Sequence, residues 1–170
     1  DITRIFDFPN YQLETYNLDK AFTTKYNGEW KSISSKEFVN QANAISRGLL
    51  RLGIMPHDKI AVISTTNRTE WNILDIGVLQ IGAQNAPIYP TISSEDYEYI
   101  LNHSEAIYCF VSDIEVLQKL NSIKKNTKLK NVYTFDEIEG ENHWTDILKL
   151  GEDSSNQNEV ESRKDNVKPN

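Results

Sequence analysis

The chain has 170 residues, a formal net charge of −7, one cysteine and 38% hydrophobic residues. This composition is typical of a globular domain, or of part of a larger one. A single cysteine, Cys109, allows no internal disulfide, and no apolar run reaches the ~18 residues of a membrane span. The single cysteine fits a reducing compartment, so we expect a cytoplasmic protein. Because no cluster of basic residues is interleaved with aromatics, we expect no nucleic-acid partner.

The first predicted elements are a β-hairpin and a helix. Residues 22–33 place Asn27-Gly28 between two strand-like runs, and Asn-Gly tolerates the positive φ angles of a type I′ turn. Residues 35–52 carry an apolar stripe at helical spacing. The capping-box pattern Ser34-Ser-Lys-Glu37 precedes this stripe and Gly53 follows it, so both ends of the helix have their signals.

Strands and helices alternate from residue 59 onward. The predicted strands cover residues 59–64, 84–89, 106–111 and 131–135, with helical segments between them. Such alternation favours parallel pairing with right-handed crossovers. Pro87 makes the second strand an edge or irregular one. The predicted fold class is therefore α/β, a mostly parallel sheet with crossover helices, preceded by an N-terminal β-hairpin and helix.

The C-terminal stretch differs in composition from the rest. Residues 136–170 hold ten acids and four bases, which is a net charge of −6 out of −7. After Gly151 only Val160 and Val167 are apolar, Pro169 aside, so we expect this stretch to bury too little surface to order itself. We therefore predict an α/β subdomain over residues 1–150 and an acidic linker or weakly helical tail over 151–170.

The standard catalytic motifs are missing. Gly77 and Gly82 have the glycine spacing of a phosphate-binding loop, but Ala83-Gln84 follows where lysine and serine or threonine are needed. The three histidines lack metal-ligand spacing, and Cys109 lies in an apolar run that favours a buried structural thiol. We therefore assign no catalytic residue and no metal ligand.

Two polar loops follow predicted strands, Ser64–Trp71 and Ile88–Ile92. Open parallel sheets bind ligands at the carboxyl ends of their strands. The candidate substrate-binding residues are Asn67, Arg68, Trp71, Tyr89 and Thr91. A local interpretation stays open, in which Asn67 or Thr69 caps a helix and Pro90 makes a rigid turn.

Taken in order, short strings over residues 20–111 resemble the N-terminal region of AMP-forming acyl-CoA synthetases, in the long-chain fatty acid branch of that superfamily. The strings are Trp30–Glu37, Gly48–Ile54, Asp58–Val62, Asn67–Trp71, Gly82-Ala83, Pro87–Thr91 and Tyr99–Ser104. His57 stands where the family usually has glycine, a small departure in a turn.

The resemblance implies a two-step reaction. A fatty acid carboxylate attacks the α-phosphate of ATP, and the thiol of CoA then displaces AMP from the acyl-adenylate. The family's phosphate loop and catalytic lysine would lie after residue 170. We therefore expect ATP, CoA and Mg²⁺ to serve the full-length enzyme, none of them binding this segment tightly.

By the same resemblance, this segment alone is an inactive scaffold and cleft wall. Its partners are the rest of the polypeptide and a fatty acid, with peripheral membrane association and a homodimer left open. Two alternatives remain, a self-standing Rossmann-like interaction or ligand-binding module, and an adenylate-forming ligase for another carboxylic acid.

Overall fold

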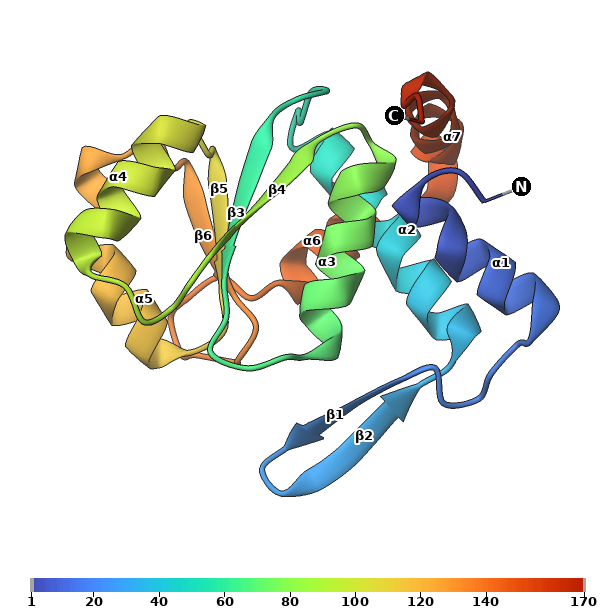
Figure 1. Ribbon diagram of the computed structural model, residues 1–170, viewed down its shortest axis with the longest axis horizontal. Coiled ribbons are helices and arrows are strands. Elements are labelled where there is room, and N and C mark those ends of the chain that lie inside the picture. The colour runs from blue at the N-terminus through green and yellow to red at the C-terminus, as the bar shows by residue number, and fades with distance from the viewer. Residues whose placement is uncertain (1, 170) are drawn as a thin grey trace. The chain divides into compact units, whose positions relative to one another are not determined.

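The computed structural model describes residues 2–169, which divide into two compact units (Figure 1). Among these residues, unit 1 holds 2–56, 67–82 and 147–169, and unit 2 holds 57–66 and 83–146. Each unit has its own sheet and its own helices, so each is described by itself.

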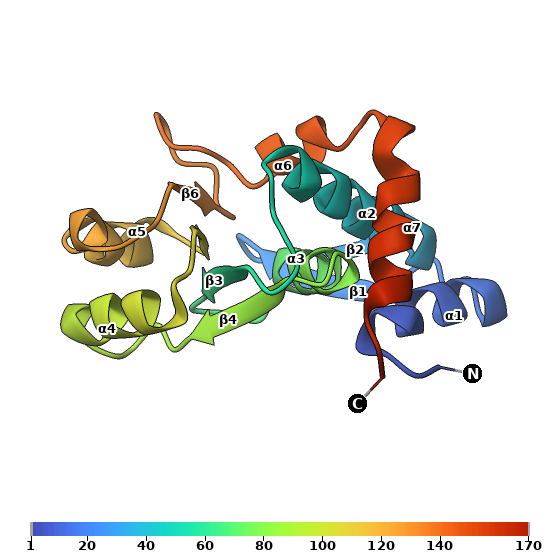
Figure 2. The ribbon, with the colours of Figure 1, turned by 90° about the horizontal axis from the view of Figure 1, so that it is seen from above.

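Unit 2 is built on a four-stranded parallel sheet with the order β4-β3-β5-β6. Its strands are β3 (Lys59–Ile63), β4 (Gln84–Ile88), β5 (Tyr108–Val111) and β6 (Asn131–Thr134). The crossover helices α4 (Ser94–Ser104) and α5 (Ile114–Asn121) cover one face of this sheet, as Figures 1 and 2 show. The predicted fold class is confirmed.

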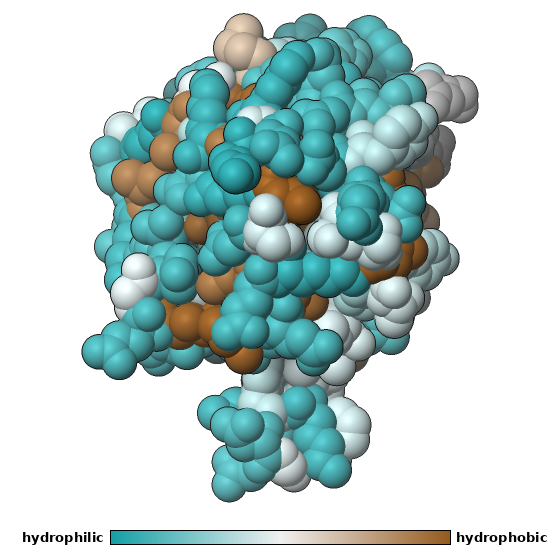
Figure 3. Space-filling view, turned by 90° about the vertical axis from the view of Figure 1, so that its left-hand side faces the viewer, coloured by the Kyte–Doolittle hydropathy of each residue, from teal (hydrophilic) through white to brown (hydrophobic). Residues whose placement is uncertain are grey.

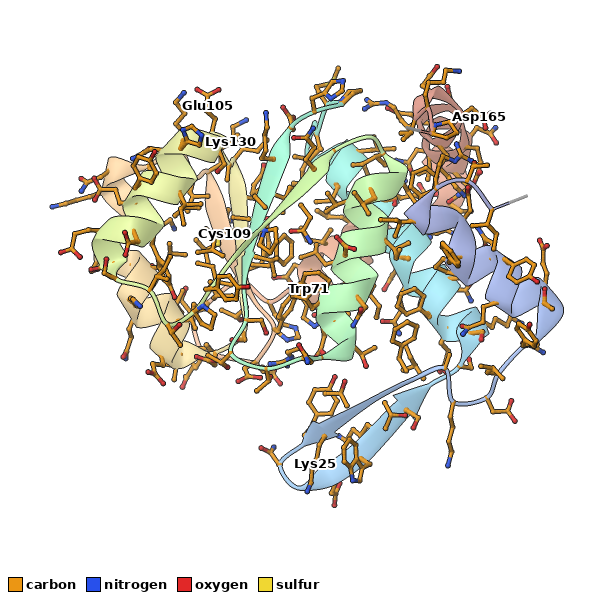
Figure 4. The ribbon with its side chains drawn as sticks, viewed as in Figure 1. Lys25, Trp71, Glu105, Cys109, Lys130 and Asp165 are labelled. Atoms are coloured by element: carbon orange, nitrogen blue, oxygen red, sulfur yellow. The ribbon has the colours of Figure 1, made fainter. Side chains whose placement is uncertain are left out.

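The core of unit 2 lies between that face and the two helices. Tyr97 and Leu101 of α4, Leu120 of α5 and Cys109 of β5 have no exposed surface. Cys109 lies inside the sheet (Figure 4), and burial raises the pKa of its thiol. A neutral, inaccessible thiol is not a nucleophile, which agrees with the predicted structural role.

β4 forms one edge of the sheet, as Pro87 predicted. The amide of Gln84 donates to the carbonyl of Asp58 beside β3. Because amides alternate in direction along a strand, those of Ala86 and Ile88 also point toward β3, and Pro87 occupies an outward position. Proline lacks a backbone N–H group, but at an outward position no hydrogen bond between β4 and β3 is lost.

Both crossover helices of unit 2, α4 and α5, begin with side-chain caps. Ser93 and Asp96 form a capping box at the start of α4. A short 3-10 helix, η2 (Lys124–Asn126), follows α5. The outer side of α4 and α5 is mostly hydrophilic with smaller apolar patches (Figure 3), as a crossover helix with one solvent face requires.

Unit 1 contains the predicted hairpin and helix. β1 (Phe22–Tyr26) pairs antiparallel with β2 (Glu29–Ile33), and the turn residues Asn27 and Gly28 have φ angles of 49° and 88°. Both angles are positive, as the predicted type I′ turn demands. α2 (Ser35–Arg51) begins with the predicted capping box.

Three further helices complete unit 1, together with short helical turns. The helices are α1 (Phe8–Thr15), α3 (Thr69–Gln80) and α7 (Gln157–Asn166), and the short 3-10 turns are η1 (Ile5–Asp7) and η3 (Ser154–Asn156). A further short helix, α6 (Thr145–Leu150), ends in this unit. α2 and α3 pack closely, because a Cβ atom at Gly77 would lie 2.5 Å from Cγ2 of Ile45. A hydrogen bond of 2.7 Å from Ser46 Oγ to the Gly77 carbonyl joins the same two helices.

For the described residues 151–169, the expectation that this stretch buries too little surface to order itself is wrong. α7 lies in this stretch, and its Val160 is fully buried. Arg47 of α2 donates to the Gly151 carbonyl at 2.7 Å and to Gln157 Oε1 at 2.6 Å. One apolar anchor and charged hydrogen bonds to carbonyl oxygens therefore order a segment of low hydrophobicity.

Among the helices of residues 2–169, none combines the length and the apolar character that a bilayer crossing requires.

Candidate functional site

Three loops follow the carboxyl ends of neighbouring strands in unit 2. The backbone amide of Thr65, after β3, donates to Ser112 Oγ at 3.0 Å, after β5. The hydroxyl groups of Thr65 and Ser112 both donate to Asp113 Oδ2, at 2.7 and 2.6 Å. Two loops are therefore joined through one carboxylate.

The same carboxylate caps α5. Asp113 Oδ1 accepts the Val116 amide at 3.1 Å, so this side chain is the N-cap of the helix. Burial alone would raise the pKa of Asp113, but the hydrogen bonds from Ser112, Thr65 and the Val116 amide outweigh it and hold this pKa below its usual value. Asp113 is thus a charged structural acceptor, and its oxygens are engaged within the protein.

The loop after β4 carries two of the predicted site residues. Tyr89 is 81% exposed and Thr91 is also exposed. Between them Pro90 lies in a turn, as the local interpretation predicted, and its carbonyl accepts a hydrogen bond of 2.7 Å from the Tyr97 hydroxyl. The two side chains are therefore presented to solvent by a loop whose backbone is tied down.

The other three predicted site residues lie in unit 1, around the start of α3. Asn67 is exposed, and Trp71 is half-buried in the first turn of the helix (Figure 4). Arg68 is only 8% exposed and forms a bidentate pair with Glu70, at 2.9 and 3.2 Å. The charge of Arg68 is therefore directed into the protein.

Tyr26 of β1 completes this buried group. Its hydroxyl donates to Glu70 Oε2 at 2.7 Å, and the Arg68 guanidinium lies 5.6 Å from the centre of its ring. Burial, reinforced by the Glu70 carboxylate, raises the pKa of Tyr26 to about 12. Burial opposes ionisation of Glu70 too, but hydrogen bonds from Arg68 and Tyr26 lower the pKa of Glu70 overall. This network attaches the hairpin to α3.

The capping of α3 differs from the local interpretation. Neither Asn67 nor Thr69 is the N-cap; Arg68 occupies that position and makes no side-chain cap. The hydroxyl of Thr24, on β1, accepts the Thr69 amide at 2.9 Å instead. A cap supplied from another strand leaves no trace in the local sequence, so this prediction was wrong for a tertiary reason.

The structure therefore groups the predicted residues in two sets, each within its own unit. Asn67, Arg68 and Trp71 share the turn into α3, and Tyr89 and Thr91 share the loop after β4. Substrate binding by these five residues stays a prediction. Thr65 lies in the predicted polar loop Ser64–Trp71 but, like Ser112, was not among the candidate residues; the signal for both is that each closely follows a strand of the sheet.

Within the part of the chain that the structure describes, no group of three or more His, Cys, Asp and Glu side chains is arranged to hold a metal ion.

An open parallel α/β sheet with polar loops at its carboxyl ends defines a class of ligand-binding domain. The family model described as AMP-binding enzyme matches residues 11–168. The chain belongs to this family, and the resemblance noted from the sequence is confirmed.

Curated relatives are ligases of fatty acids. Long-chain-fatty-acid--CoA ligase FadD15 of Mycobacterium bovis is 40% identical over 83 residues, which cover 49% of this chain and 14% of that protein. Fatty acyl-CoA synthetase A of Dictyostelium discoideum is 30% identical over 151 residues, covering 81% of this chain and 22% of that protein. The chain thus spans less than a quarter of the length of these two relatives.

Solved structures agree on the fold. The anthranilate CoA ligase AuaEII in complex with anthranoyl-AMP has a TM-score of 0.73 at 22% identity, covering 85% of this chain and 26% of that chain. The long-chain-fatty-acid-CoA ligase FadD1 of Archaeoglobus fulgidus has a TM-score of 0.71 at 21% identity, covering 86% and 29%. At these identities the similarity shows the fold alone.

Proposed function

We propose that this chain is the N-terminal part of an ATP-dependent long-chain fatty acid–CoA ligase. The observation that carries the proposal is the family match over residues 11–168, together with the relatives named as fatty acid–CoA ligases. In the proposed reaction the acid's carboxylate oxygen bonds to the α-phosphorus of ATP and pyrophosphate leaves. The sulfur of CoA then bonds to the acyl carbon, AMP leaves, and the thiol proton passes to a base or to water.

The contribution of this chain is structural and positional. Mg²⁺ bound to ATP would neutralise phosphate charge, and the remaining polypeptide would hold the nucleotide. The loops at the carboxyl ends of β3, β4 and β5 would form one wall of the cleft, with Tyr89 and Thr91 exposed toward it. Holding the acid in line with the phosphate is the effect that such a wall supplies.

The proposal is tested by acid-dependent release of pyrophosphate from ATP. The full-length protein is assayed with palmitate, benzoate and an amino acid, beside the 170-residue chain at equal concentration. We expect release by the full-length protein with palmitate, and none by the 170-residue chain. Preference for benzoate or the amino acid would contradict the long-chain assignment, and release by the 170-residue chain would contradict the scaffold role.

Three further predictions accompany this function. The polypeptide after residue 170 is predicted to contain a Ser/Thr/Gly-rich loop with a lysine, and sequencing the gene tests this prediction.

Peripheral membrane association is measured by flotation with lipid vesicles. Homodimer formation is measured by light scattering of the purified full-length protein.

A further inference from the structure

The loop between β4 and α4 is held by a lysine from another helix. Lys119 of α5 donates from its ammonium group to the carbonyl oxygens of Pro90, at 3.2 Å, and of Ile92. The Pro90 oxygen also accepts the Tyr97 hydroxyl. A carbonyl oxygen has two lone pairs, and here each has a donor of its own.

The lysine and the tyrosine also support one another. The Lys119 ammonium lies 4.5 Å from the centre of the Tyr97 ring, so it is attracted by the ring face while it bonds to the loop. Tyr97 is fully buried as a residue, and burial raises its pKa to about 12. Its hydroxyl therefore stays protonated and remains a donor over the physiological pH range.

A turn at Pro90 does not by itself require the hydrogen bonds from Lys119 and Tyr97. Pro90 already restricts the backbone at its own φ angle. Ordering a long lysine side chain costs conformational entropy, and placing it partly out of water costs hydration of the ammonium group. Charged hydrogen bonds to two loop carbonyls offset these costs only while the loop keeps this one conformation.

Tyr89 and Thr91 flank the residue that is held. Each is one position from Pro90, and both are exposed. We infer that Lys119 and Tyr97 are positioning residues that fix the 89–92 loop, and thereby set where Tyr89 and Thr91 meet the acid substrate. This inference rests on the proposed function.

The first test measures the loop itself, by amide hydrogen exchange in the full-length protein. Lys119→Met keeps the length of the side chain and removes its charge, and Tyr97→Phe removes only the hydroxyl. For each variant we expect exchange at the Ser93 and Asp96 amides to become roughly tenfold or more faster, because these hydrogen-bonded amides close the loop at the start of α4 and open when the loop is released. Lys125→Met, at an exposed lysine of η2, is the matched control and should leave these amides unchanged.

The second test separates positioning from mere stability. In the full-length enzyme, Lys119→Met should raise the KM for fatty acid about tenfold, with kcat within about threefold and the KM for ATP unchanged, because the wall and not the nucleotide site moves. Lys119→Arg keeps donors and charge, and should restore most of the loss. Because Lys119 and Tyr97 share the Pro90 carbonyl, the double variant should cost less than the product of the two single effects.

Unchanged exchange in Lys119→Met would overturn the inference, and so would faster exchange with an unchanged KM for fatty acid. The proposed function fails separately, by absence of acid-dependent pyrophosphate release in the unmodified protein. That outcome would remove this inference as well, whereas the first two leave the proposed function intact.

Discussion

The two segments that carry the predicted site residues use their polar groups differently. The loop after β4 exposes Tyr89 and Thr91, and its backbone is held from behind by Tyr97 and Lys119. The turn into α3 buries Arg68, whose charge is paired with Glu70. A polar residue after a strand can thus be directed to a ligand or to the protein interior, and burial distinguishes the two.

The largest test of this difference is Arg68→Met. The substitution leaves the Glu70 carboxylate buried without its guanidinium partner, at a side-chain exposure of 10%. Breaking a buried pair in this way costs about 3–5 kcal/mol. We expect a matching fall in the free energy of unfolding of the 170-residue chain, measured by urea denaturation, while Lys36→Met on the exposed side of α2 changes it little. A loss below about 1 kcal/mol would show that Arg68 is free for another role.

The pH dependence of stability sharpens the same point. The pKa of Glu70 is lowered from its ordinary value of 4.5, so the folded state favours the charged form. Its contribution is therefore fully present above pH 4.5 and is lost as the pH falls through the lower folded-state pKa. We expect the stability difference between the unmodified chain and Glu70→Gln to be largest near neutral pH and to shrink in acid. A stability difference that stays the same from neutral to acidic pH would contradict this expectation.

A smaller effect is expected at Asp113, which joins the loops after β3 and β5. Asp113→Ala removes the cap of α5 and the acceptor for Thr65 and Ser112. Loss of a cap costs about 1–2 kcal/mol, and thermal unfolding of the 170-residue chain would measure it. Asp113→Asn keeps a capping oxygen and should recover about half of that loss. Equal losses in the alanine and asparagine variants would mean that the carboxylate charge of Asp113, and not its capping oxygen, stabilises the protein.

The smallest stability effect is expected at Tyr89. Because its side chain is 81% exposed, Tyr89→Ala should change the free energy of unfolding by less than about 0.5 kcal/mol. In the full-length protein the same variant should raise the KM for fatty acid several-fold, because one apolar contact between the tyrosine and the acid is lost. Tyr99→Ala, at a tyrosine of α4 that is 68% exposed, is the control for both measurements. An unchanged KM would remove Tyr89 from the predicted site.

The predictable parts of the fold are those coded by neighbouring residues. The Asn27-Gly28 turn, the capping box before α2 and the edge position of Pro87 each follow from one local constraint. The parallel sheet follows from the alternation of apolar strands with helices, since crossovers of this kind allow few arrangements. The order β4-β3-β5-β6, in contrast, depends on which strands meet, and no single segment specifies it.

For the candidate site, the sequence determined by itself which loops follow strands, and so that Tyr89 and Thr91 would stand at a carboxyl end. Only the tertiary structure decided that Arg68 is buried against Glu70, that Thr24 caps α3, and that Lys119 reaches the Pro90 loop. It also decided that residues 157–166 form a helix, because the groups that order it come from α2. The reason is common to all four: each depends on a contact between segments far apart in the chain, which for the Arg68–Glu70 pair is the hydroxyl of Tyr26 on β1. Caps and periodicity, in contrast, act within a few residues.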